Sequence, residues 1–299
     1  MESIGKEINI IYYLKVLWKR KVLIISVTFI FSLASVLFSL WLPNIYSSSA
    51  TLALINDPKG SSNRFANSQL GSIATLANIN IETNSIDRFS MASATIFSRD
   101  FASKLYLDDV IVASMMTAKK YDKKTKNLEY DKSEFNSLDN KWVDKKPTFA
   151  EFHKELKRVL NFEQDKRFDV IYLSFDNISP EFSFDMVNLI LTTLDKDIRA
   201  RDLKKSEEAL DYLNTQYRNT QNAALKNSLN FLTQNHLETQ MLANIGDFYY
   251  FDVIDQAHIP FHKKSPSRAL ICILGFMLGL LTSILFVLFE QIISKTKNS

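Results

Sequence analysis

The stretch IPFHKKSPSRALICILGFMLGLLTSILFVLFE, residues 259–290, decides the architecture of this protein. It carries two prolines, Pro260 and Pro266, then a basic cluster, and then the uncharged run 269–289. A helix of that length is about 30 Å long, which matches the hydrocarbon core of a bilayer. Because proline can neither continue a strand nor donate a backbone hydrogen bond, the sequence predicts a stiff, extended segment that leads the chain into a membrane.

A second uncharged run lies near the start of the chain, at residues 22–42, VLIISVTFIFSLASVLFSLWL. Aliphatic and aromatic residues fill both runs, and no Asp, Lys or Arg opposes their insertion into lipid. A cleaved signal peptide has a shorter apolar core followed by a small-residue cleavage site, and a buried core helix is shorter or carries polar interruptions. Two transmembrane helices, 22–42 and 269–289, are therefore predicted.

The charges beside the two runs predict the orientation of the chain. The tail of residues 1–21 carries five basic and two acidic residues, and a basic flank keeps that side of a first helix in the cytoplasm. Two lysines place the tail of residues 290–299 on the same side, whereas the basic cluster before the second run opposes this weakly. Residues 43–268 are then expected outside the cytoplasm, which in a bacterium with two membranes is the periplasm.

The middle of the chain, residues 43–268, is predicted to form an α+β domain. Residues 46–55 alternate small or polar with apolar side chains, as a strand does, and residues 248–254 form a last strand before the second span. Pairing these two strands would place both spans side by side. The remaining expectations are a strand at 170–175, helices at 84–104 and 147–160, a Ser- and Asn-rich loop at 61–70 and a solvated connection at 119–146.

A helical hairpin is predicted at about residues 180–243. Ser179, Pro180 and Glu181 form a strong helix start, because serine caps, proline fits the first turn and glutamate complements the helix dipole. Apolar residues follow at helical spacing as far as Ile198 and become sparse beyond it, so the helix begins packed and then leaves the domain. A second helix then returns. The sparse stripe indicates either a protruding arm or a surface that packs on a neighbouring copy.

The sequence carries no recognisable pattern of catalytic residues. A phosphate-binding glycine loop is absent, and the four histidines, including His258 and His262 on either side of Pro260, lack the spacing of metal ligands. The single cysteine, Cys272, excludes an internal disulfide and lies in an apolar run where a thiolate is disfavoured. A net charge of +3 gives no strong attraction to nucleic acid. We therefore expect no catalytic residue, cofactor, metal or nucleic-acid partner.

Two features of the spans and their flanks are candidate sites. Gly275 and Gly279 form a small-x-x-x-small pattern that allows close helix approach, and Ser35 and Ser39 are candidates for the facing surface in the first span. This surface is predicted to serve helix packing or contact with a partner in the membrane, although glycines are also common in membrane helices without such a role. The proline-rich segment with Pro260 and Pro266 is the second candidate, and its alternative is a passive linker.

The order of these parts resembles the Wzz-type polysaccharide chain-length determinants, also called polysaccharide co-polymerases. The stretch EINIIYYLKVLWKRK (residues 7–21) looks like the family's cytoplasmic lead-in, and PNIYSSSATL (43–52) is similar to its strand after the first span. The family's strand, turn and helix are similar to residues 170–191, VIYLSFDNISPEFSFDMVNLIL. Its closing strand and proline-rich lead to the second span are similar to residues 241–271, MLANIGDFYYFDVIDQAHIPFHKKSPSRALI. In this chain Pro180 follows Ser179 where the family often has Asp-Pro, and the helical arm is short, which leaves the oligomer size and the polymer length open.

The resemblance implies an inner-membrane protein that sets the modal length of a lipid-linked polysaccharide, typically O-antigen. It implies a ring of identical protomers working with a membrane polymerase, and no enzymatic activity. One alternative is a polysaccharide export adaptor of the inner membrane, which shares the same architecture. A ligand sensor is a further alternative, but it needs a cytoplasmic output domain, and neither tail is expected to be long enough for one.

Overall fold

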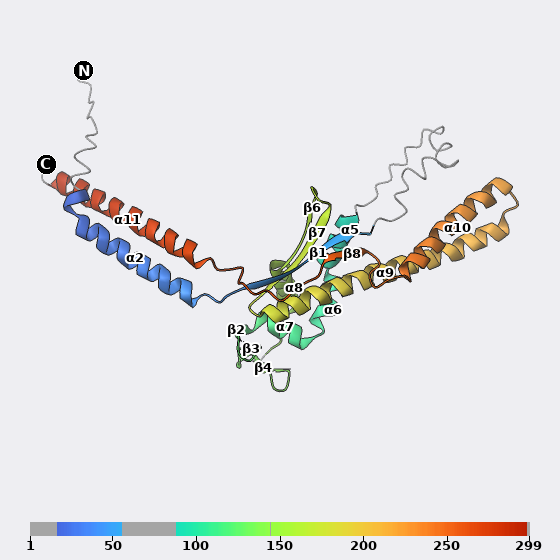
Figure 1. Ribbon diagram of the computed structural model, residues 1–299, viewed down its shortest axis with the longest axis horizontal. Helices are drawn as coiled ribbons and strands as arrows, with labels where there is room; N and C mark the ends of the chain where they lie inside the picture. Colours follow the sequence, from blue (N-terminus) through green and yellow to red (C-terminus); the bar gives the residue numbers. More distant parts are fainter. Residues whose placement is uncertain (1–16, 56–87, 144, 298–299) are drawn as a thin grey trace, which may run out of the picture. The chain divides into compact units, whose positions relative to one another are not determined.

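The computed structural model of the protein describes residues 17–55, 88–143 and 145–297. The chain forms two compact units, Met1–Ile45 with Lys263–Ser299, and Tyr46–His262. The first unit holds two long apolar helices, and the second holds a sheet, the helices that cover it and a helical hairpin (Figure 1).

A four-stranded antiparallel sheet forms the centre of the second unit. The strands lie in the order β6-β7-β1-β8, and their bounds are Leu160–Asp165, Val170–Asn177, Tyr46–Leu54 and Phe251–Asp255. Buried residues alternate along β1, as expected for a strand with one face against a core. The expected pairing of the first and last strands is confirmed, with Leu52 opposite Val253 and Leu54 opposite Phe251.

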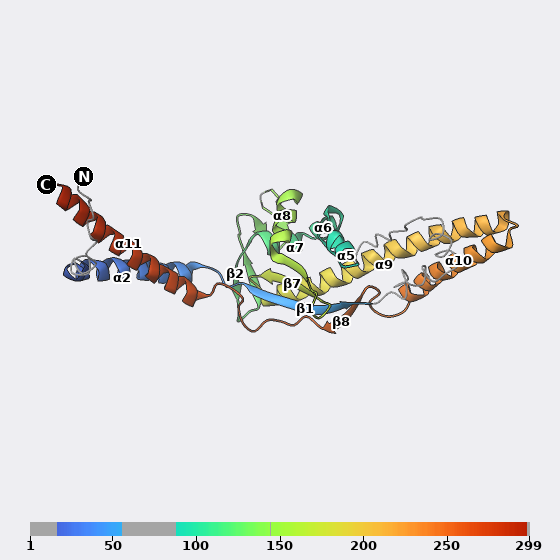
Figure 2. The ribbon, with the colours of Figure 1, turned by 90° about the horizontal axis from the view of Figure 1, so that it is seen from above.

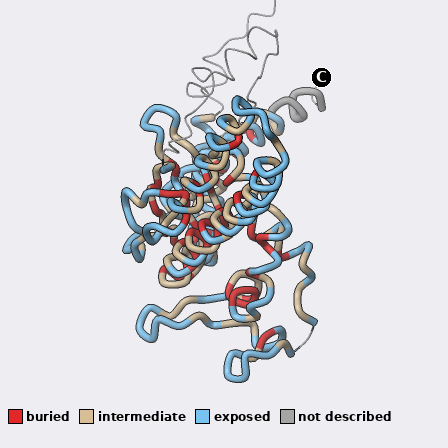
Figure 3. The backbone as a smooth tube through the Cα atoms, turned by 90° about the vertical axis from the view of Figure 1, so that its right-hand side faces the viewer, coloured by how far each residue is buried: buried red, intermediate tan, exposed pale blue. Residues whose placement is uncertain are grey.

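Helices pack on this sheet and close the core. The first half of α9 (Pro180–Asn219) lies across β1 and β7, and α8 (Phe149–Val159) packs on β6 and β7. These two helices are in turn contacted by three short ones, α5 (Arg88–Ile96), α6 (Arg99–Tyr106) and α7 (Asp109–Met116). Figure 3 shows buried segments gathered inside this base, and its fully buried side chains include Phe101, Phe152, Phe175, Phe251, Leu194 and Ile198.

The helical hairpin extends from the base. Its first helix, α9, has 40 residues and is about 60 Å long, and Ser179 caps its start by accepting a hydrogen bond from the Phe182 N–H. Asn222 caps the returning helix, α10 (Ala223–Ala243), which runs alongside the distal half of α9 in both Figure 1 and Figure 2. Leu213 and Leu229 are buried on these facing helices, whereas most of the hairpin is exposed or half-buried.

The first unit consists of the antiparallel helices α2 (Lys21–Trp41) and α11 (Arg268–Lys297). Both are long and apolar enough to cross a membrane, and only a small share of either is buried within the protein, unlike the core helices of soluble proteins. The predicted fold class, an α+β domain with a helical hairpin flanked by two long apolar helices, is confirmed.

Two local predictions are wrong. The helix expected at 84–104 is two helices in its described part, because Ser98 adopts an extended conformation and caps α6 by accepting a hydrogen bond from the Phe101 N–H. The connection expected at 119–146 forms two hairpins instead. The second is held by a small aromatic cluster, in which the buried Phe135 ring lies 5.4 Å from Tyr130 and 5.1 Å from Trp142. The loop expected at 61–70 lies outside the described residues.

Candidate functional site

The two apolar helices approach each other through small residues. A Cβ atom added at Gly275 would collide with the side chain of Ser35. One added at Gly279 would lie 2.7 Å from the Phe31 Cβ and 3.1 Å from the Thr28 Cα, and the latter is backbone that cannot easily move. The spacing of α2 and α11 therefore depends on the absence of a side chain at both glycines.

Ser39, the fourth residue expected on this surface, is also buried, but it is not among the nearest neighbours of either glycine. The place beside Gly279 belongs to Thr28, which sequence reasoning did not single out. Thr28 is seven residues before Ser35, which is about two helical turns, so a search for small polar residues at that spacing would have found it. A contact of this surface with a polymerase stays a prediction.

Polar contacts tie the two helices together at both ends. The guanidinium of Arg20 lies 2.7 Å from the carboxylate of Glu290, and Arg268 donates to the side-chain carbonyl of Asn44 at 3.2 Å. Both partners of the ion pair are about half-exposed, so it contributes less than about 1 kcal/mol in water. The ion pair joins the residue just before α2 to a position near the other end of the chain, on α11.

The segment with the two prolines runs beside the chain that follows α2. The Ile45 N–H donates to the Ser265 carbonyl at 2.9 Å, and the Lys264 N–H donates to the Ile45 carbonyl at 2.8 Å. Pro266 follows this bridge through a cis peptide bond, and Pro260 precedes it within the second unit. The two segments that lead to the helices are thus joined by backbone hydrogen bonds. Any role of the prolines beyond linking stays a prediction.

A buried carboxylate attaches the returning chain to α9. Asp195 is almost fully buried and accepts hydrogen bonds from the backbone N–H groups of Tyr249, at 3.0 Å, and Tyr250, at 2.7 Å. The guanidinium of Arg199 lies 3.1 Å from the same carboxylate and also donates to the Asp247 carbonyl. Since Tyr250 leads into β8, this contact sets where the chain leaves the hairpin and rejoins the sheet.

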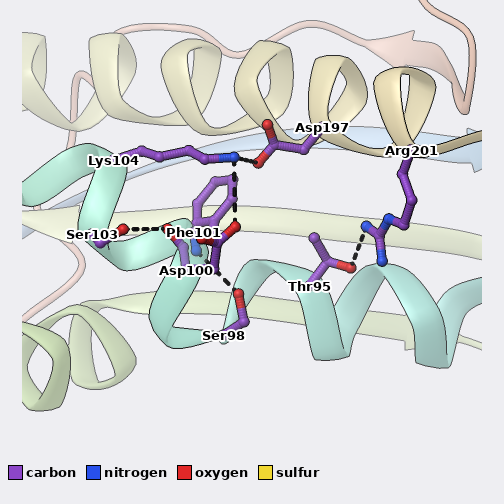
Figure 4. A network of polar contacts seen from close by, with 8 residues as sticks. All are labelled: Thr95, Ser98, Asp100, Phe101, Ser103, Lys104, Asp197 and Arg201. Carbon is purple, nitrogen blue, oxygen red and sulfur yellow. Dashed lines mark hydrogen bonds and ion pairs between the residues drawn. The ribbon is translucent and has the colours of Figure 1, made fainter. Parts of the chain in front are cut away.

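A polar groove of about 750 Å³ lies between α5 and α6 on one side and α9 on the other (Figure 4). Lys104 bridges its two sides, with an ammonium group 2.7 Å from Asp197 and 3.7 Å from Asp100. Arg201 crosses the groove and donates to the Thr95 hydroxyl at 3.0 Å. These contacts join the short helices to the base of the hairpin. In the described part of the chain, no group of three or more His, Cys, Asp or Glu side chains could hold a metal ion.

The outer half of the hairpin exposes apolar side chains. Met241 is 65% exposed and Leu237 is 46% exposed, four residues apart on α10. Others on the hairpin and at its base are Tyr212, Tyr217, Leu225, Phe231, Leu242 and Ile245. Scattered apolar residues are normal on a surface, but a run of them along one helix pair is typical of a contact surface.

The sequence of the first part of the chain is similar to a known family. Residues 6–106 match the family model described as "Wzz: Chain length determinant protein". They include α2, β1, α5 and α6, and with them one wall of the polar groove. The expected resemblance is thus confirmed over this third of the chain, whereas the proline segment and α11 lie beyond the matched residues.

Solved structures of polysaccharide co-polymerases show a more distant likeness. A "full-length bacterial polysaccharide co-polymerase" is 14% identical over 94% of this chain and 97% of its own, with a TM-score of 0.41. A fragment of WzzB, a polysaccharide co-polymerase from Salmonella Typhimurium, is 13% identical over 74% of this chain and 100% of its own, with a TM-score of 0.29. At these scores neither structure bears on the function of this chain. No curated protein shows significant similarity to it.

Proposed function

We propose that this protein regulates the modal chain length of a lipid-linked surface polysaccharide, namely lipopolysaccharide O-antigen. The observation that carries the proposal is the match of residues 6–106 to the chain length determinant family. The protein acts without catalysis of its own, as a homo-oligomeric ring beside a membrane polymerase.

The topology that we propose is a two-pass protein of the bacterial inner membrane. α2 and α11 cross the bilayer, both termini lie in the cytoplasm, and the Tyr46–His262 unit lies in the periplasm. The basic residues before α2 and the length and composition of both helices support this orientation. The two spans, held together at Gly275 and Gly279, offer a surface in the membrane that a polymerase could contact.

Deletion of the gene tests the proposal. The sugar-repeat ladder of the surface polysaccharide, resolved on a gel, should lose its modal length and become broad while polymer is still made. Complementation with the wild-type chain should restore the modal band. An unchanged ladder would contradict length control, and loss of all surface polymer would instead favour the export adaptor.

A further inference from the structure

A lysine-rich hairpin projects from the base, outside the residues that match the family model. It consists of β2 (Ala118–Asp122), β3 (Asn127–Tyr130) and the turn between them, and we call it the lysine hairpin. It carries two carboxylates and five lysines, a net charge of +3, and its members are Asp122, Glu129, Lys119, Lys120, Lys123, Lys124 and Lys126. Charge of one sign concentrated on 13 residues attracts partners of the opposite charge.

Most of this charge is available to a partner. Lys119 forms an ion pair with Asp131. The carboxylate of Asp122 accepts hydrogen bonds from the Lys124 N–H and the Thr125 hydroxyl, both at 2.9 Å, and so is used in holding the turn. The other four lysines are exposed, and none forms an ion pair with a carboxylate in the described ranges, although Glu129 stands opposite Lys120 in the strand ladder.

The lysine hairpin is fixed on the first residue of β1. The ring of Tyr121 meets the buried ring of Tyr46 edge-on, with centroids 6.4 Å apart, and the ammonium group of Lys123 lies 5.8 Å from the centre of the Tyr46 ring. Burial, and then a hydrogen bond with Glu181, raise the pKa of Tyr121 above its usual value, so its hydroxyl stays protonated. The lysine hairpin is therefore anchored on the packed base through the contacts of Tyr121 and Lys123 with Tyr46.

Chain length alone limits how far the lysine hairpin can lie from the bilayer. α2 ends at Trp41, and an extended chain of five residues reaches Tyr46 within about 18 Å. The ammonium group of Lys123 lies 5.8 Å from the centre of the Tyr46 ring, so the length of the chain allows it to be at most about 28 Å from the end of that helix. On the second connection, the His258 carbonyl accepts a hydrogen bond from the Ser48 hydroxyl at 2.8 Å, and Phe261, 90% exposed, lies seven residues before α11 begins.

We propose that the lysine hairpin binds the surface of an anionic phospholipid bilayer next to the two spans. Lysines attract anionic headgroups within about a Debye length, and an exposed aromatic residue such as Phe261 is typical of the membrane interface. Lipid contact at the lysine hairpin adds a third attachment to the two covalent ones. The proposal rests on the two membrane spans proposed above and is independent of polysaccharide length control.

Amine labelling of the full-length protein in lipid nanodiscs tests this proposal. The discs contain phosphatidylcholine alone, or phosphatidylcholine with phosphatidylglycerol, and acylation of each lysine is followed by mass spectrometry. An anionic surface at about −30 mV keeps nearby amines protonated, so Lys120, Lys123, Lys124 and Lys126 should be acylated about threefold more slowly in the anionic discs. High salt should remove the difference. Lys166 and Lys205, exposed on the β6–β7 turn and on distal α9, serve as controls and should not change.

Three results would overturn the proposal. Equal acylation of the four hairpin lysines in both kinds of disc would show that they do not meet the bilayer. A slowing of Lys205 by the same factor would show a general effect of the anionic lipid. Equal protection by inorganic phosphate, added to the phosphatidylcholine discs, would show a simple anion site. None of these results would affect the sugar ladder, so failure here and failure of the proposed function can be distinguished.

Discussion

At the scale of single residues, Asp195 should be the most sensitive charged position of the base. The substitution Asp195→Ala removes the acceptor of two backbone N–H groups and the carboxylate that pairs with Arg199. We expect a loss of about 3 kcal/mol in the free energy of unfolding, measured by denaturant unfolding of the full-length protein in detergent. Asp197→Ala is the matched control, because its partly exposed ion pair with Lys104 should contribute less than about 1 kcal/mol. Similar losses in the two variants would contradict this role.

A second prediction at this scale concerns acid stability. Hydrogen bonds from Lys146 and then Trp142 lower the pKa of Asp109 below its usual value. The ionised Asp109 therefore adds its full contribution to the free energy of unfolding when the pH is above the usual pKa of an aspartate. That contribution is lost as the pH falls through the lowered pKa of Asp109 in the folded protein. Asp109→Asn should lose less stability than the wild type between about pH 5 and pH 2.5, as measured by thermal unfolding. If the unfolding temperature of the variant fell with pH as steeply as that of the wild type, the contacts of Asp109 would add nothing to stability. Part of the pH dependence should remain in the variant, because the pKa values of Asp131 and Glu151 are also lowered.

At the scale of elements, the pairing of α2 with α11 depends on Gly279. In Gly279→Leu the new side chain would meet Phe31 and the backbone of Thr28, and such overpacking costs about 1–3 kcal/mol. We expect a lower unfolding temperature in detergent and a broadened sugar ladder on complementation. Ala269→Leu adds bulk at an exposed position of the same helix and should change neither. If both variants behave like the wild type, the close approach of the helices has no importance for stability or function.

The elements that could be predicted from the sequence are those with strong periodicity or caps. The two apolar helices, β1 with its alternation and α9 with the Ser179-Pro180 start all lie where the residues place them. The sequence does not predict β6, because Leu160–Asp165 follows α8 directly and carries two acidic residues, which are unfavourable in a strand. The sequence of the lysine hairpin predicts a solvated connection, because its many lysines are unfavourable in a strand and the contact of Tyr121 with Tyr46 cannot be read from the sequence.

The candidate site was predictable only in part for a similar reason. The small residues Gly275, Gly279 and Ser35 are easy to recognise because they lie in two otherwise apolar runs. In the structure Gly275 lies against Ser35, and Gly279 lies against the same helix. Thr28 and Asp195 are harder to recognise, because a threonine or an aspartate in a helix is ordinary until its partner across the fold is known. The polar groove likewise joins α6 to α9, whose residues lie about 100 positions apart in the sequence.

At the scale of the whole molecule, the exposed apolar residues of the hairpin should hold copies of the protein together. Leu237 and Met241 lie one helical turn apart on α10, and the short-range packing within the hairpin does not cover them. Placing carboxylates there, in Leu237→Glu with Met241→Glu, should desolvate charge in any contact between copies and so disfavour it. We expect a smaller oligomer in detergent by light scattering, and a ladder without a modal band.

The matched control adds the same charge to the same helix at polar positions. Asn230 and Gln234 are exposed, also four residues apart, and Asn230→Glu with Gln234→Glu leaves the apolar surface intact. This variant should keep the oligomer and the modal band, because added charge alone does not remove apolar contact area. An oligomer that persists in the Leu237 and Met241 variant would place the contact between copies on another surface of the chain. An oligomer that is lost equally in the control would show that added charge on this face of α10, and not the loss of apolar contact area, separates the copies.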